Sequence, residues 1–163
     1  MSRGEYPATR MRRNRMKAFS RRLVAENSIS TDDLIWPLFV IEGTNCAEAI
    51  ASMPGVNRWS IDRLIDQAGL ALSLGIPAIA IFPSIDPAQK DAAGSLARDG
   101  NNLVCRAVSA VKSAHPDLGI ICDVALDPFT DHGHDGLFVD GQILNDETIA
   151  ILCEQAVHQA NAG

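Results

Sequence analysis

Short apolar runs alternate with longer amphipathic stretches along most of the chain. The runs are strand-sized and almost wholly apolar, at 34–41, 77–82 and 119–124. Strands of that kind are usually covered on both faces. Stretches with apolar residues at helical spacing follow them, at 60–74, 102–114 and 145–161. The pattern predicts three consecutive strand–helix units.

Local signals place the ends of these elements. Ser60 is expected to cap the first helix, and Gly75 to end it. Pro37 lacks a hydrogen-bond donor, so we place the start of the first strand there. Asn145 or Asp146 is expected to cap the last helix. The apolar face of that helix is predicted to consist of Ile149, Leu152, Ala156 and Val157.

Three segments between the elements are polar or rich in glycine and proline, which predicts loops at 42–57, 84–100 and 127–141. Loops as long as 84–100 are often functional lids rather than plain connectors.

Repeated strand–helix units indicate an α/β fold with a parallel sheet and outer helices. Both the doubly wound fold and the (β/α)₈ TIM barrel show this pattern. The sequence contains no GxGxxG and no Walker A motif, which weakens the nucleotide-binding version. A barrel needs roughly 200 residues or more, and this chain of 163 supplies only three of eight units. We therefore expect a truncated chain or one that a partner completes.

Charge divides the chain into a basic arm and an acidic body. Residues 1–22 hold eight of the 14 basic residues and one of the 20 acidic residues. We assign residues 1–30 to an N-terminal arm, with a short helix over 15–24, and residues 31–163 to the first part of a barrel. A basic N-terminus is typical of binding to nucleic acid, an organelle or an acidic protein surface. We favour the acidic body of a neighbouring subunit, since few basic or aromatic residues outside the arm support nucleic-acid recognition.

Other features of the composition point to a cytoplasmic protein. No stretch of 18 apolar residues occurs, so no transmembrane helix is expected. The first residues lack the apolar core of a signal peptide. The four cysteines are far apart, without a CxxC pair, and we expect four reduced thiols and no structural zinc.

The densest polar cluster is the segment 123–136 (DVALDPFTDHGHDG). Asp123 stands at the carboxyl end of a predicted strand, where barrels and doubly wound folds carry their active sites. The residue types allow three interpretations. His132 and His134 with a carboxylate would suit zinc or iron. Several of the aspartates together would suit magnesium. A polar turn whose aspartates cap backbone amides remains the third.

The chain resembles the porphobilinogen synthase family, also called δ-aminolevulinic acid dehydratase. The segments that carry the resemblance span most of the chain in the family's order, at 10–24, 32–43, 52–62, 75–83, 123–136 and 145–163. The resemblance implies a (β/α)₈ barrel whose N-terminal arm embraces a neighbour, commonly in an octamer. It also implies condensation of two 5-aminolevulinate molecules to porphobilinogen on the way to haem and other tetrapyrroles.

The resemblance further implies which branch of the family this is. The zinc-dependent branch has three cysteines where this chain has Ala125, Asp127 and Asp135. The branch without them uses Mg²⁺, often with a monovalent cation, and carboxylates do favour harder ions than thiolates. By resemblance, Asp127 and Asp135 face the substrate cavity and are weak candidates for metal binding. Asp123 is expected to be a supporting acid.

One departure from the family concerns its Schiff-base lysines, which lie in the second half of its chains. This sequence has only Lys17, Lys90 and Lys112, none at the end of a predicted strand. We expect it to be the N-terminal half of the enzyme, inactive alone. The alternative is a noncatalytic barrel fragment that retains only the oligomerisation arm.

Overall fold

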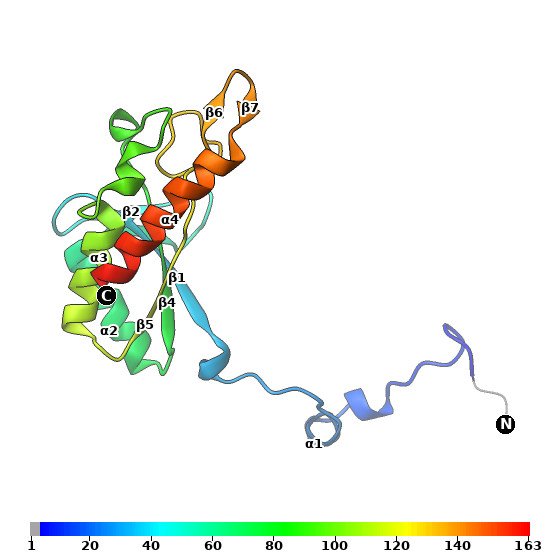
Figure 1. Cartoon of the computed structure of the whole chain (residues 1–163). Coiled ribbons are helices and arrows are strands. Elements are labelled where there is room, and N and C mark those ends of the chain that lie inside the picture. Colours follow the sequence, from blue (N-terminus) through cyan, green and yellow to red (C-terminus); the bar gives the residue numbers. More distant parts are fainter. Residues whose placement is uncertain (1–3) are drawn as a thin grey trace. The chain divides into compact units, whose positions relative to one another are not determined.

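The computed structural model describes residues 4–163 and divides the chain between Ser30 and Thr31 (Figure 1). The first unit contains a short 3₁₀ turn, η1 (Arg13–Arg15), and one helix, α1 (Ala18–Leu23). That helix lies within the stretch 15–24 expected to be helical. The second unit, Thr31–Gly163, contains the sheet and the remaining helices.

The sheet has five strands in the order β2-β3-β1-β4-β5. Their bounds are β1 Ile35–Ile41, β2 Ala47–Ala49, β3 Asn57–Ser60, β4 Ala78–Pro83 and β5 Gly119–Cys122. Strands β3, β1, β4 and β5 run parallel, and only β2 is antiparallel to its neighbour within the sheet. A separate two-stranded ribbon joins β6 (Phe138–Val139) to β7 (Gln142–Ile143).

Three helices lie on one side of β1 and β4, at α2 (Ile61–Ser73), α3 (Leu103–Ala114) and α4 (Asn145–Ala162) (Figure 1). Shorter 3₁₀ turns occur at η2 (Thr31–Asp33), η3 (Pro87–Gln89) and η4 (Ser95–Arg98). The core between sheet and helices includes Val40, Leu64, Ile79 and Val108, all buried. The three predicted strand–helix units are thus present. No helix within residues 4–163 is both long and apolar enough to cross a membrane.

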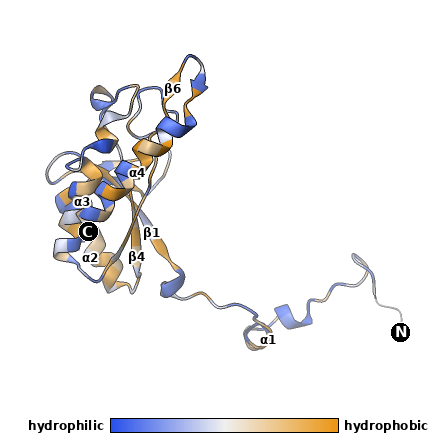
Figure 2. Ribbon diagram, viewed as in Figure 1, coloured by the Kyte–Doolittle hydropathy of each residue, from blue (hydrophilic) through white to orange (hydrophobic). Residues whose placement is uncertain are grey.

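The opposite face of the sheet is apolar but bare, contrary to the expectation of strands covered on both faces. Leu38 and Val40 of β1 are buried against the helices, whereas Ile35 of β1 is 54% exposed and Ile121 of β5 is 44% exposed. Figure 2 shows the hydrophobic colouring of β1 and β4. Within Thr31–Gly163 no second layer covers this face, so the strands of this unit are buried on one side only.

Pro37 lies inside β1 rather than at its start. The carbonyl of Val40 accepts a hydrogen bond from Ser84, on the β4 side. Along a strand, the backbone N–H and C=O groups of successive residues point to opposite sides. Pro37 is three residues from Val40, so its backbone nitrogen points toward β3. The pairing of β3 with β1 begins only at Phe39. The missing N–H therefore costs no ladder hydrogen bond, and the predicted start at Pro37 is two residues late.

The segment 42–57 is not simply a loop, because it contains β2 and the first residue of β3. Strand β3 has the sequence NRWS, which is too short and polar to stand out as a strand. Ser60 ends β3 and precedes α2 as expected, but its side chain makes no helix-capping bond. Its buried hydroxyl instead accepts from the Cys46 amide and donates to the Asp62 carboxylate. Gly75 ends the helix region at φ +75°, a conformation that favours glycine.

Helix α4 buries a different face from the predicted one, and its N-cap is Leu144 rather than Asn145 or Asp146. Ile149 and Val157 are 50% and 58% exposed, and Leu152 and Ala156 are half-buried. The buried residues are Thr148, Ile151, Gln155 and Gln159. The prediction was wrong because Ile151 and three polar side chains, rather than Ile149 and Val157, face the rest of the domain.

Candidate active site

Two long loops meet beyond the carboxyl ends of β4 and β5. Asp91, in the loop after β4, forms a parallel bridge with Thr130, in the loop after β5. The Asp131 amide donates to the Asp91 carbonyl at 3.2 Å, and a ring nitrogen of His132 lies 3.2 Å from the Ala92 carbonyl. The loops at 84–100 and 127–141 therefore form one layer at the edge where parallel sheets carry their active sites.

Three aspartates of the polar segment, Asp123, Asp127 and Asp135, influence one another in this region. Asp127 is exposed, but partial loss of water around its carboxyl raises its pKa, and the neighbouring charges of Asp135 and Asp123 raise it further. Lys90 acts in the opposite direction and with a smaller effect. Like charges that share a site disfavour full ionisation, so this cluster suits binding a cation or exchanging a proton. The charges that act on Asp127 do not include Asp131.

The carboxylate of Asp135 is fixed by a backbone group. Its Oδ1 accepts a hydrogen bond from the Leu126 amide at 2.6 Å. Leu126 and Ala125 are buried, whereas Asp123, Asp127 and Asp135 are exposed. The backbone of this segment is thus held inside the domain while its carboxylates reach the surface.

The two histidines of this segment are engaged with each other and with Phe138. The His134 amide donates to Nδ1 of His132 at 3.1 Å, and the His134 ring lies 4.6 Å from the ring of Phe138. Both nitrogens of His132 therefore have partners. Within residues 4–163, no group of three histidine, cysteine, aspartate or glutamate side chains is placed to hold a metal ion. This arrangement does not favour the zinc or iron interpretation of the two histidines, and a need for Mg²⁺ stays a prediction.

The three lysines lie in the positions expected from the sequence, away from strand ends. Lys17 is in the arm and exposed, and Lys90 follows η3 in the long loop. Lys112 of α3 donates from Nζ to the carbonyls of Pro116 and Leu118 at 2.9 and 3.2 Å. None of them is buried. Cys122 is also unsuited to nucleophilic chemistry, because burial, followed by nearby Cys105, raises its pKa to about 11.

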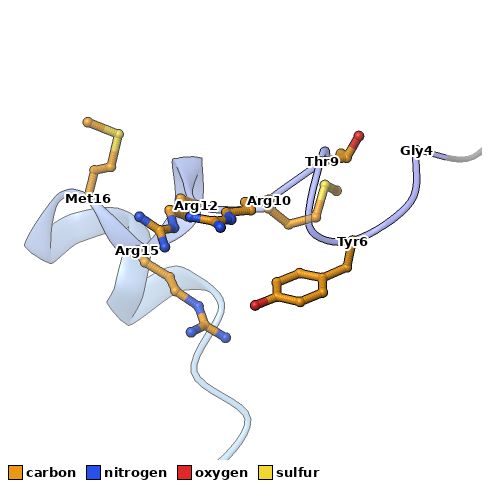
Figure 3. A pocket seen from close by; sticks show the side chains of 8 residues that line it. Gly4, Tyr6, Thr9, Arg10, Arg12, Arg15 and Met16 are labelled. Carbon is orange, nitrogen blue, oxygen red and sulfur yellow. The ribbon is translucent and has the colours of Figure 1, made fainter.

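The arm contains a hollow of about 1120 Å³ lined by arm residues alone (Figure 3). The guanidinium of Arg10 lies 5.8 Å from the centre of the Tyr6 ring. Arg12 and Arg15 also line the hollow, which contains no carboxylate. It lacks the acid and base groups of the aspartate cluster, and we do not regard it as an active site.

Comparison with known proteins decides the family. The sequence model of delta-aminolevulinic acid dehydratase matches residues 8–163, almost the whole chain. The chain belongs to the delta-aminolevulinic acid dehydratase family. A delta-aminolevulinic acid dehydratase of Bradyrhizobium diazoefficiens is 58% identical over 96% of this chain and 44% of its own length. One from Chlamydia pneumoniae is 44% identical over 94% of this chain and 46% of its own.

The fold agrees with a solved structure of the same family. The delta-aminolevulinic acid dehydratase (porphobilinogen synthase) of Toxoplasma gondii ME49, solved in complex with the reaction product porphobilinogen, superposes with a TM-score of 0.88 and 41% identity. The match covers 95% of this chain and 44% of that one. The chain thus spans a little under half the length of the dehydratases that it matches.

Sequence reasoning missed the residues of α4 that support this dehydratase segment. Thr148, Gln155 and Gln159 are buried, and each binds a backbone group of the region 123–137. Glutamine in a helix usually lies at the surface, so nothing marked them individually. Their spacing was the available signal, since 148, 155 and 159 share one helical face without charged residues.

Proposed function

We propose that this chain is part of a porphobilinogen synthase, which condenses two 5-aminolevulinate molecules to porphobilinogen in tetrapyrrole biosynthesis. The observation that carries the proposal is the group of Asp123, Asp127 and Asp135 after the carboxyl end of β5, in which the Leu126 amide fixes Asp135 and the charges of Asp135 and Asp123 act on Asp127. This cluster lies within the family match, and a family member has been solved with porphobilinogen.

In this proposal Asp127 and Asp135 handle the substrate. The substrate carries an ammonium group, and a cation placed between carboxylates relieves their mutual repulsion. Asp127, with its raised pKa, is suited to accept and return a proton during the condensation. Asp135 is held by the Leu126 amide and presents a fixed negative charge. Asp123 supports both by its charge.

Substitution of Asp127 tests this role. In the whole protein, Asp127→Asn removes the charge and nearly keeps the shape, and we expect turnover to fall by roughly 10²–10⁴-fold, the usual worth of acid–base catalysis. The melting temperature should not fall. Asp131→Asn is the matched control, since Asp131 is exposed and outside the charge cluster. An Asp127→Asn protein that melts far lower yet turns over normally would show that the segment is only a structural turn.

We also propose that the sheet belongs to a (β/α)₈ barrel. The bare apolar face, with Ile35 and Ile121 exposed, is the face that a barrel turns inward. Strand β5 has one neighbour among the described strands, and further units would cover its free edge. The whole protein would then supply the Schiff-base lysines. The alternative, a noncatalytic fragment that keeps only the arm, predicts no activity from any longer form of the chain.

We propose that the arm attaches to a neighbouring subunit. Deletion of the arm tests this. The arm carries seven arginines and the body is acidic, so the contact should weaken as salt screens it. Removing residues 1–22 from the whole protein should shift an octamer toward smaller oligomers in sedimentation. A wild-type-sized oligomer after deletion would refute the assignment. Exposed apolar side chains among the arginines, including Met16 and Phe19, favour a protein surface over nucleic acid.

Two further expectations remain proposals. We propose a cytoplasmic location, supported by four cysteines without a disulfide partner. We also propose a requirement for Mg²⁺ and a monovalent cation, which rests on the aspartates in place of cysteines. Activity measured after chelation and after return of Mg²⁺ tests it.

A further inference from the structure

Helix α4 directs uncharged polar side chains toward the segment that carries the aspartates. Gln155 and Gln159 are 1% and 7% exposed, while Ile149 and Val157 of the same helix are at least half exposed. Burial of an amide is unfavourable unless the amide is hydrogen-bonded. Ile151 is the one apolar side chain of α4 that is buried beside these glutamines. Two amides thus occupy buried positions on this helix, which indicates that their hydrogen bonds matter.

The two glutamines bind successive outward carbonyls of one extended segment. Nε2 of Gln155 donates to the Ala125 carbonyl at 3.1 Å, and Nε2 of Gln159 donates to the Asp123 carbonyl at 2.9 Å. Gln155 and Gln159 are four residues apart, about 6 Å along the helix, and α4 thus holds this segment at two points.

The contact of Gln155 leads directly to Asp135 through a single peptide unit. The carbonyl of Ala125 accepts from Gln155, and the amide of the same peptide, on Leu126, donates to Oδ1 of Asp135 at 2.6 Å. Hydrogen bonds at both ends of a peptide group polarise it and strengthen each other. The orientation of the Asp135 carboxylate is thus coupled to the side chain of Gln155.

We propose that Gln155 is a positioning residue for the carboxylates Asp135 and Asp127, acting through the peptide between Ala125 and Leu126. The inference rests on the proposed function for its catalytic meaning. Gln159 secures the start of the segment at Asp123, two peptide units farther from Asp135. Nε2 makes the contact to Ala125, while Oε1 of Gln155 is buried and has no hydrogen-bond partner among the described residues.

Two substitutions on the same helix separate this coupling from general loosening of α4. Gln155→Met and Gln159→Met each keep side-chain length and remove one amide. In the 163-residue chain, Gln155→Met should move the Leu126 amide proton upfield and speed its hydrogen exchange by roughly five- to tenfold, the factor of one net hydrogen bond. Gln159→Met should leave the Leu126 signal close to that of the wild type. No change in folded Gln155→Met, or equal changes in both variants, would overturn the proposal.

A measurement on the wild-type chain covers the case in which a variant does not fold. The side-chain amide protons of Gln155 should exchange far more slowly than those of exposed Gln142. Equal rates would overturn the proposal without any variant. These readouts need no turnover, so an inactive whole protein would count against the proposed function and not against the role of Gln155.

Discussion

At the scale of single residues, Asp91 and Asp127 lie in adjoining loops and have opposite pKa shifts. The backbone amide of Ser95, above other groups, lowers the pKa of Asp91, whose carboxylate accepts from the Ala93 and Ser95 amides at 3.0 Å. Burial and the charges of Asp135 and Asp123 raise the pKa of Asp127. The Asp91 carboxylate orders its own loop through these hydrogen bonds. The charged form of Asp127 is disfavoured, which suits the substrate handling proposed for it.

These shifts predict opposite effects on stability. A lowered pKa stabilises the fold above the ordinary value of 3.8, and this is lost as the pH falls through the folded value. A raised pKa contributes its full stabilisation of the fold only below 3.8. That stabilisation is lost as the pH rises through the pKa of the folded state. At pH 7, Asp91→Asn should therefore lower the melting temperature and Asp127→Asn should raise it slightly. Both differences should shrink as the pH approaches about 3.

Thermal unfolding of the two variants followed by circular dichroism between neutral and acid pH checks this, with Asp131→Asn as the exposed control. A lower melting temperature for Asp127→Asn at neutral pH would contradict the raised pKa.

At the scale of elements, strong periodicity and terminal signals predicted the larger pieces. Strands β4 and β5 and helices α2 and α3 lie within a few residues of their predicted bounds, because apolar runs and helical spacing reflect burial directly. Strand β3 was missed because it has only four residues. Their extended conformation depends on pairing with β1 and not on their own sequence. The face of α4 was wrong for a similar reason, since its buried glutamines depend on backbone partners far along the chain.

The N-terminus of α3 offers a test of one such local signal. Asn102 is 2% exposed, and its side chain accepts from the Cys105 amide at 3.0 Å and donates to the Leu96 carbonyl. Asn102→Ala should lower the free energy of unfolding by about 1–2 kcal/mol, since an N-cap is lost. Asn101→Ala is the control, because Asn101 is exposed and the hydrogen bonds described for it involve its backbone. Urea unfolding with an unchanged m-value measures the difference, and equal stability of the two variants would contradict the capping role.

At the scale of the whole molecule, the sequence predicted an α/β body, and the structure has a largely parallel sheet with helices on one side. The sequence also singled out Asp123, Asp127 and Asp135, and in the structure the charges of Asp135 and Asp123 act on Asp127. The backbone contacts that orient them could not be predicted. Every peptide bond has a carbonyl, and nearly every one has an amide, so a sequence does not mark the Leu126 amide or the Ala125 carbonyl. Only the folded chain selects Asp135 and Gln155 as their partners.

The 163-residue chain alone is expected to show no porphobilinogen synthase activity. Schiff-base formation needs a neutral amine within reach of the substrate ketone. A lysine in water has a pKa of about 10.4, so roughly one in 10³ is neutral at pH 7. Burial would be needed to change this, yet none of Lys17, Lys90 and Lys112 is buried. Lys90 is the one whose charge reaches Asp127, and it is thus the first place to look for an exception.

Incubation with 5-aminolevulinate and borohydride, followed by mass spectrometry, should give no stoichiometric adduct, as in a sample without substrate. An adduct on one of these lysines together with turnover would show that the described residues already contain the nucleophile, and that the aspartate cluster works without a further segment.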